Sequence, residues 1–126
     1  MKLHHLGIAT KNIKKSKEFV LSTHTAISEI GPVWDPNLKA NLLMIQIVEG
    51  LSIELVSGPA VESILKKGIS LYHYCYEVED INDKINEFQK AGGLLIVKPT
   101  PAVLFDGRLV SFIFTPIGLI ELLNRK

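Results

Sequence analysis

Two histidines and two glutamates stand at matching places in the two halves of this 126-residue chain. His5 and His73 each begin a short apolar run, and Glu54 and Glu121 each sit in an Ile-Glu-Leu triplet. The histidines are 68 positions apart (73 − 5) and the glutamates 67 (121 − 54). A nearly constant offset indicates an internal duplication, in which each half supplies one imidazole and one carboxylate.

The glutamates decide what those four groups could do together. In a strand, side chains alternate between faces, so each glutamate points away from its aliphatic neighbours, toward solvent or toward a concave interior. Two unpaired carboxylates in an interior would be costly, whereas a divalent cation held with two imidazoles removes that cost. Solvent-exposed glutamates and structural histidines are the alternative, which treats the repetition as coincidence. We predict a metal site formed by His5, Glu54, His73 and Glu121.

This set of ligands limits the identity of the metal ion only partly. Nitrogen and oxygen ligands suit Zn, Co, Ni, Mn or Fe(II), and the sequence does not choose among them. We expect one divalent ion.

Residue periodicity predicts the elements that hold these donors in the first half. The pattern indicates a strand at 3–10, an amphipathic helix at 12–22 and three further strands at 27–33, 41–48 and 51–56. Asn12 is a suitable N-cap for the helix, and residues 34–37 read as a loop. A short helix at 59–67, ended by Gly68, leads into the second half.

The second half repeats this order. It is predicted to contain a strand at 71–78, a helix from Ile81 that Gly92-Gly93 ends, and strands at 94–98, 109–115 and 119–123. Asp106-Gly107 predicts a hairpin turn between 103–105 and 109–115. Since no helix separates consecutive strands within each group of three, a doubly wound parallel sheet is excluded. We expect one α+β domain over 1–126, with modules at about 1–58 and 69–126.

Composition limits the compartment and the partners. The net charge is +1, no basic run is interleaved with aromatic residues, and Cys75 is the only cysteine. No apolar run approaches the ~20 residues of a membrane span. We expect a soluble, cytoplasmic domain that binds neither nucleic acid nor membrane and acts on a small molecule.

Three segments form a recognisable set: His-His-Leu-Gly-Ile-Ala at 4–9, Cys-Tyr-Glu-Val-Glu-Asp-Ile at 75–81 and Thr-Pro-Ile-Gly-Leu-Ile-Glu-Leu at 115–122. In this order and spacing they resemble the vicinal-oxygen-chelate superfamily, which includes glyoxalase I, methylmalonyl-CoA epimerase and the extradiol dioxygenases. The paired His4-His5, Glu54-Leu55 and Pro101-Ala102-Val103 are most similar to methylmalonyl-CoA epimerase-like proteins. The resemblance implies two βαβββ modules that form a curved, half-open mixed sheet around a metal, in a homodimer.

The same resemblance implies an enzyme. The expected activity is that of a metal-dependent isomerase or epimerase, which forms a metal-stabilised enolate from an acyl thioester or a 2-oxo compound. Glu121 is the catalytic base by analogy with the family. A glyoxalase-like lyase acting on a thiol adduct and a metal-free small-molecule-binding protein of the same fold are the alternatives.

Two residue patterns depart from a methylmalonyl-CoA epimerase. Residues 41–48 contain no acid that could be a second base. Tyr72-His73 stands where a His-His pair is usual; if the ligand position were 72, the metal set would be broken.

Overall fold

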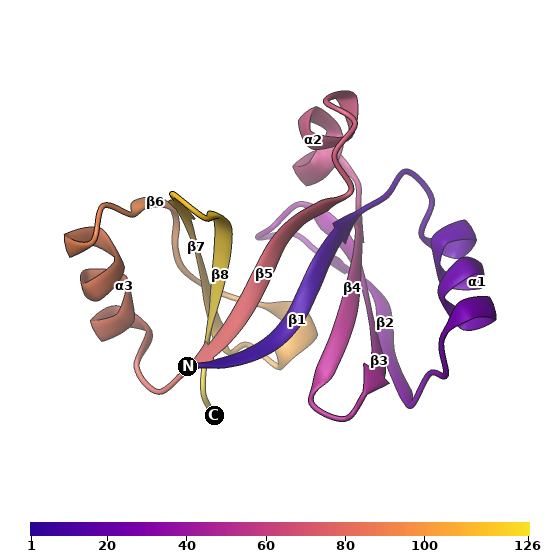
Figure 1. The fold of residues 1–126 in the computed structure, drawn as a ribbon, viewed down its shortest axis with the longest axis horizontal. Helices are drawn as coiled ribbons and strands as arrows, with labels where there is room; N and C mark the ends of the chain where they lie inside the picture. Colours follow the sequence, from indigo (N-terminus) through magenta and orange to yellow (C-terminus); the bar gives the residue numbers. More distant parts are fainter.

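The computed structural model describes residues 1–126 and contains one eight-stranded mixed sheet that curls around its own interior (Figure 1). Its strands are β1 (Lys2–Ala9), β2 (Ser28–Asp35), β3 (Ala40–Val48), β4 (Leu51–Ser57), β5 (Leu71–Val78), β6 (Leu94–Pro101), β7 (Leu109–Thr115) and β8 (Gly118–Asn124). The order across the sheet is β2-β3-β4-β1-β5-β8-β7-β6. The predicted α+β fold with a curved mixed sheet is confirmed.

The centre of the sheet brings together the four strands that carry the predicted donors. β1 and β5 pair antiparallel, and each has a parallel partner on its other side, β4 beside β1 and β8 beside β5. β2 and β6, which have partners on one side only, form the two edges.

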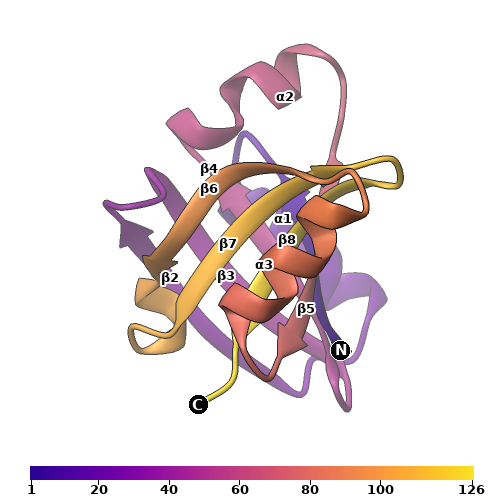
Figure 2. The same ribbon diagram turned by 90° about the vertical axis from the view of Figure 1, so that its left-hand side faces the viewer.

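Two helices cover the outside of the curl, as Figure 2 shows for α3 in front of the sheet. They are α1 (Ile13–Thr23) and α3 (Ile81–Lys90); the shorter α2 (Glu62–Lys66) follows the 3₁₀ turn η1 (Pro59–Val61). The expected N-cap of α1 is present, because the Asn12 side chain accepts a hydrogen bond from the Lys15 N–H at 3.0 Å. No helix has the length and hydrophobicity needed to span a bilayer.

Hydrophobic packing on both faces of the sheet explains why the strands are so apolar. Along β3, Leu43 and Ile45 pack outward with Val20 of α1, whereas Leu42 and Met44 face the interior. A strand buried on both faces needs apolar residues at successive positions, which is the pattern of residues 42–45.

One local prediction is wrong in the loop before β7. Val103–Phe105 forms a second 3₁₀ turn, η2, and β6 pairs with β7 through Pro101 and Leu109, so Asp106-Gly107 is not a two-residue hairpin turn. The dipeptide does adopt the positive φ angles that it favours, 53° and 82°. β6 also continues through Pro99 and Pro101, which an edge strand tolerates because its outer N–H groups need no partner.

A buried carboxylate joins the two edges of the curl. β2 extends two residues past the predicted end at 33, to Asp35, whose side chain is fully buried. Its Oδ1 accepts hydrogen bonds from the N–H groups of Asn37 at 2.9 Å and Leu38 at 3.1 Å, and its Oδ2 accepts from Val103 N–H at 3.0 Å. Asp35 therefore holds η2, from the second half, against the turn after β2.

Candidate metal centre

Strand register places the four predicted donors on one face, in two adjacent rows. In one row His5 of β1 lies beside Cys75 of β5, and Cys75 lies beside Glu121 of β8. In the other, Glu54 of β4 lies beside Gly7 of β1, which lies beside His73 of β5. Each histidine thus faces a small residue on the neighbouring central strand.

The side chains of His5, Glu54, His73 and Glu121, here called the donor cluster, converge on one point. Nε2 of His5 lies 2.9 Å from Oε1 of Glu121 and 3.5 Å from Oε1 of Glu54. Nε2 of His73 lies 3.1 and 3.4 Å from the same two oxygens, and the two Nε2 atoms are 3.3 Å apart. All four residues are at most 4 % exposed.

These distances fit a metal ion. Donors about 2.1 Å from a common ion are separated by about 3.4 Å in a tetrahedral arrangement and by about 3.0 Å between neighbours in an octahedral one. The observed 2.9–3.5 Å spans those values. Two imidazoles and two carboxylates also give a ligand set that such ions accept. The donor cluster could therefore hold one divalent ion.

Without an ion, the cluster is a tightly coupled group of charges. Burial alone lowers the pKa of His73, but the hydrogen bonds and charges of Glu121 and Glu54 outweigh it and raise that pKa to about 9. Burial raises the pKa of Glu121, but hydrogen bonds from His5 and His73 outweigh it and hold that pKa well below its ordinary value. A proton at His73 thus occupies the place that a metal ion would take.

His4 fixes the orientation of the neighbouring donor. Its Nδ1 lies 2.9 Å from Nδ1 of His5, and burial followed by the proximity of His5 lowers the pKa of His4. When Nε2 of His5 acts as a ligand, its Nδ1–H can donate to the neutral His4 ring. The ring of Phe105 stacks on His5, with centroids 5.8 Å apart and planes 20° from parallel.

Gly7 is what makes room for the second imidazole. A β-carbon at this position would lie 2.1 Å from Cε1 of His73. Nδ1 of His73 faces this strand and has no hydrogen-bond partner, although it is buried. The rings of Tyr72 and Phe112 meet His73 edge-on, at centroid distances of 4.4 and 5.3 Å.

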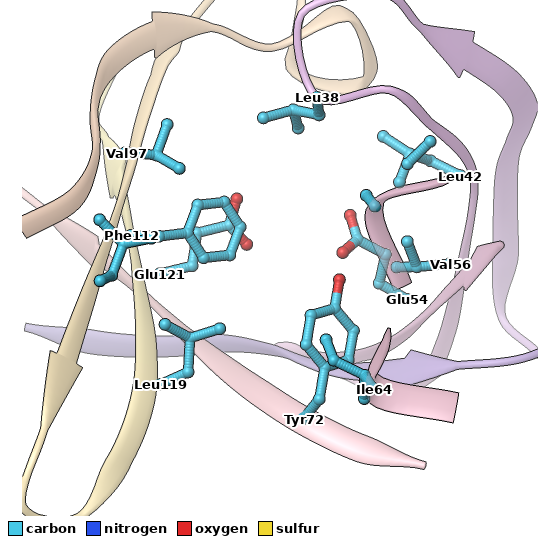
Figure 3. Close-up of a pocket in the computed structure, with 13 residues that line it drawn as sticks. Leu38, Leu42, Glu54, Val56, Ile64, Tyr72, Val97, Phe112, Leu119 and Glu121 are labelled. Atoms are coloured by element: carbon cyan, nitrogen blue, oxygen red, sulfur yellow. The ribbon is translucent and has the colours of Figure 1, made fainter. Parts of the chain in front are cut away.

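An apolar cavity of about 270 Å³ opens beside the donor cluster. Glu54 and Glu121 lie on opposite sides of it, and the Tyr72 hydroxyl points inward from below them (Figure 3). Burial, followed by the charges of Glu54 and Glu121, raises the pKa of Tyr72 well above 10.0, so its hydroxyl stays protonated.

A second cavity, of about 280 Å³, has a different character. It is lined by His4, Arg108 and Lys126 together with hydroxyl and amide side chains. Arg108 is already paired with Glu77 at 2.5 Å. His4 and Tyr72 are related by the same offset as the histidine donors (72 − 4 = 68), yet they line different cavities.

The sequence predicts the four residues of the donor cluster but not the residues that position their side chains. The structure brings all four predicted donors together, and His73, not Tyr72, faces the cluster. Gly7 could have been found, because the offset matches it with Cys75 (75 − 7 = 68), two small residues at equivalent places. Phe105 could not, because it comes from a loop without periodic pattern.

Structural comparison finds close counterparts of the fold. A hypothetical protein from Bacillus halodurans shares 24 % identity and has a TM-score of 0.79, covering 99 % of this chain and 94 % of that one. Methylmalonyl-CoA epimerase from Mycobacterium tuberculosis shares 16 % identity with a TM-score of 0.82, covering 99 % and 88 %. A Streptomyces coelicolor methylmalonyl-CoA epimerase variant in complex with 2-nitronate-propionyl-CoA gives 16 % and 0.77, covering 98 % and 94 %. At these identities the likeness establishes a shared fold.

Sequence comparison gives the family. Curated protein sequences provide no significant match. The family model of the glyoxalase/bleomycin resistance protein/dioxygenase superfamily matches residues 4–112. That range contains three of the four donors and most of the chain, and it agrees with the resemblance of the three motifs. The protein therefore belongs to the glyoxalase/bleomycin resistance protein/dioxygenase superfamily.

Proposed function

We propose that this protein is a metal-dependent enzyme that moves a proton next to a carbonyl group, as an isomerase or epimerase of an acyl thioester or a 2-oxo compound. The observation that supports this most directly is the donor cluster, whose four ligand atoms lie within 4.8 Å of one another beside an apolar cavity. Members of the superfamily typically bind a metal. Solved structures with this fold include epimerases in complex with methylmalonyl-CoA and with 2-nitronate-propionyl-CoA.

A bound divalent ion would supply Lewis-acid polarisation of the substrate carbonyl, which acidifies the adjacent C–H bond. Glu121 is the base in this proposal, because its carboxylate lines the cavity and is held ionised. An oxygen of Glu121 takes the α-proton, the C–H electron pair becomes a C=C bond to the carbonyl carbon, and the carbonyl π pair moves onto its oxygen, giving an enolate. Return of a proton to the opposite face of the same carbon gives an epimer. Where that carbon carries a hydroxyl group, return of the proton to the former carbonyl carbon and loss of the hydroxyl proton give an isomer with the carbonyl moved by one carbon, so no oxidant or reductant is needed.

One observation favours the glyoxalase-like lyase as the second candidate. Epimerisation needs a proton donor on the face opposite the base, whereas transfer between adjacent carbons can use one carboxylate on one face. Glu54 and Glu121 lie on opposite sides of the cavity, but both belong to the donor cluster, and using both for proton transfer would remove both carboxylate ligands from the ion. No other acid lines the cavity, and β3 contributes only Ala40 and Leu42 to it. A thiol adduct of a 2-oxoaldehyde, which isomerises by such a transfer, therefore belongs among the substrates tested.

The decisive experiment measures exchange with solvent. Protein loaded with Zn²⁺, Co²⁺, Ni²⁺, Mn²⁺ or Fe²⁺ is incubated in D₂O with acyl thioesters and with hemithioacetals, and deuterium at the α-carbon is followed by mass spectrometry. The expected result is exchange that needs metal and falls at least 100-fold in Glu121→Gln. Exchange with thioesters supports the isomerase or epimerase, and conversion of hemithioacetals alone supports the lyase.

Metal analysis tests the remaining alternative. The proposal predicts one ion per donor cluster and its loss in His5→Ala. A protein that takes up no stoichiometric ion, and whose ligand binding is unchanged in His5→Ala, is a metal-free binding protein, and the proposed chemistry is then wrong.

A further inference from the structure

The walls of the cavity beside the donor cluster are almost entirely hydrocarbon. Apart from Glu54 and Glu121, they come chiefly from aliphatic side chains and Phe112 (Figure 3). None of the thirteen lining residues is a lysine, an arginine or a histidine. A carboxylate or phosphate placed against these walls, away from an ion in the donor cluster, would lose its hydration with no cationic side chain beside it, which is strongly unfavourable.

The size of the cavity suits a compact apolar group. An apolar cavity of about 150 Å³ is enough to hold benzene. The present one measures about 270 Å³, so a phenyl ring or a branched alkyl chain fits with room for the atoms that connect it to a carbonyl. Ala60 and Ile96 are the exposed lining residues, so they mark its mouth, and the donor cluster lies at its inner end.

Tyr72 is the only lining residue whose side chain donates a hydrogen bond at neutral pH. Its ring is held edge-on against His73, with centroids 4.4 Å apart, and it packs against the interior core. Two residues further along β5, the Tyr74 hydroxyl donates a hydrogen bond to the backbone oxygen of Ile117 at 2.7 Å. The Tyr72 hydroxyl instead points into the cavity (Figure 3).

We propose that the substrate places an uncharged, apolar group of about phenyl size in this cavity, and that the Tyr72 hydroxyl donates a hydrogen bond to an oxygen next to that group. The proposal rests on the proposed function, which puts the reacting carbonyl at the donor cluster. The substrate class is then an aryl or branched-alkyl carbonyl compound, not an acyl group that carries its own carboxylate, as methylmalonyl does. Tyr72 is a specificity-determining residue.

Three small probes separate these contributions. Acetophenone carries a phenyl ring and one carbonyl acceptor, 4-acetylbenzoate adds a carboxylate, and ethylbenzene lacks the acceptor. Their dissociation constants are measured by ligand-observed NMR with metal-free protein and with Zn²⁺-loaded protein. Acetophenone is expected to bind at least tenfold more tightly than 4-acetylbenzoate in both states. Equal binding, tighter binding of the carboxylate with Zn²⁺ present, or no acetophenone binding at millimolar concentration would overturn the proposal.

Two substitutions assign the selectivity to named residues. Tyr72→Phe should weaken acetophenone binding about 2- to 10-fold, the range for one neutral hydrogen bond, and leave ethylbenzene unchanged. Ile96→Lys puts an ammonium group at the mouth and should raise the affinity for 4-acetylbenzoate about 3- to 10-fold. Val48→Lys is the matched control, because Val48 is 52 % exposed against 55 % for Ile96 and does not line the cavity. An equal effect of both lysines, or of Tyr72→Phe on both neutral probes, contradicts the assignment.

The outcomes distinguish this proposal from the proposed function. Stoichiometric metal and deuterium exchange without the probe preference would leave the function standing and remove the substrate class. The probe preference and the Tyr72→Phe effect without metal uptake or exchange would remove the enzyme function and leave a binding site for apolar carbonyl compounds.

Discussion

Gly7 determines where the His73 ring can lie, and Gly7→Ala therefore tests how tightly the donor cluster is built. A β-carbon at Gly7 would lie 2.1 Å from Cε1, 2.2 Å from Nδ1 and 2.4 Å from Nε2 of His73. Gly7 is not among the residues with positive φ, so alanine meets no backbone penalty there. The effect of the substitution falls on the imidazole.

The required movement is large compared with what a metal site tolerates. Bringing the nearest contact from 2.1 Å to an ordinary 3.4 Å separates the atoms by a further 1.3 Å (3.4 − 2.1). Metal–ligand distances vary by only about 0.2 Å, so Nε2 of His73 leaves the ligand set. Disturbing a residue that merely supports a ligand costs about 10- to 100-fold in affinity; displacing the ligand itself should cost at least 100-fold. Overpacking should also lower the free energy of unfolding of the metal-free protein by about 1–3 kcal/mol.

Two measurements follow these effects separately. Competition with a chromogenic chelator gives the Zn²⁺ affinity, and urea unfolding without metal gives stability. In the His73→Ala background the ring is absent, so Gly7→Ala should then cost little further stability. Gly68→Ala is the control for a glycine substitution away from the cluster: nothing lies within 4 Å of its β-carbon position, and its φ of +75° adds a backbone penalty that Gly7 lacks.

A single result would refute this reasoning. If Gly7→Ala binds Zn²⁺ as tightly as the unmodified protein and loses no stability, His73 does not occupy the position described and is not a ligand there. A stability loss that persists in the His73→Ala background would instead trace the cost to the strand backbone.

Three further predictions concern protonation and support. Because the pKa of His73 is raised from 6.5 to about 9, a metal ion must displace the His73 proton, and the logarithm of the Zn²⁺ affinity should rise by about one per pH unit up to pH 9. For the same reason the metal-free protein should lose thermal stability in melts between pH 6.5 and 9, and a flat profile would contradict the raised pKa. Asp35→Ala leaves three N–H groups without their acceptor and should lower the free energy of unfolding, measured with urea, by about 2–4 kcal/mol. Asp35→Asn should lose less, and equal losses in the two variants would show that these hydrogen bonds do not stabilise the protein. His4→Ala removes the acceptor for Nδ1 of His5 and should weaken Zn²⁺ binding about 10-fold in chelator competition, while His4→Gln, which keeps an acceptor, should restore part of it.

The order of elements and the convergence of His5, Glu54, His73 and Glu121 could be predicted because both follow from local patterns repeated twice. Alternation places Glu54 and Glu121 each on the face of its own strand opposite to its aliphatic neighbours. The nearly constant offset then supplied what one strand cannot, namely that His73 is the counterpart of His5 and Glu121 the counterpart of Glu54. The prediction was possible because the duplication relates distant residues by a nearly constant offset along the sequence.

The rest depends on contacts between segments that no spacing relates. The sequence predicts a loop at Asp35, yet its buried carboxylate accepts a hydrogen bond from the N–H group of Val103, 68 residues away. Asp106-Gly107 has the φ angles of a hairpin turn, but tertiary packing of the preceding 3₁₀ turn decides how the chain uses them. The stacking of Phe105 on His5 depends on that same turn and has no local signal.

The difference between His4 and Tyr72 affects the orientation in which a ligand can bind at the donor cluster. The antiparallel β1–β5 pair, with a parallel partner on each side, relates the two halves of the donor cluster by an approximate twofold axis. With full symmetry, a ligand would bind in two equivalent orientations, and Glu54 and Glu121 would be interchangeable. An apolar cavity on the Tyr72 side and a polar one on the His4 side remove that degeneracy. A ligand with one apolar end then binds at the donor cluster with that end on the Tyr72 side, which makes the two carboxylates chemically distinct although they arose as copies.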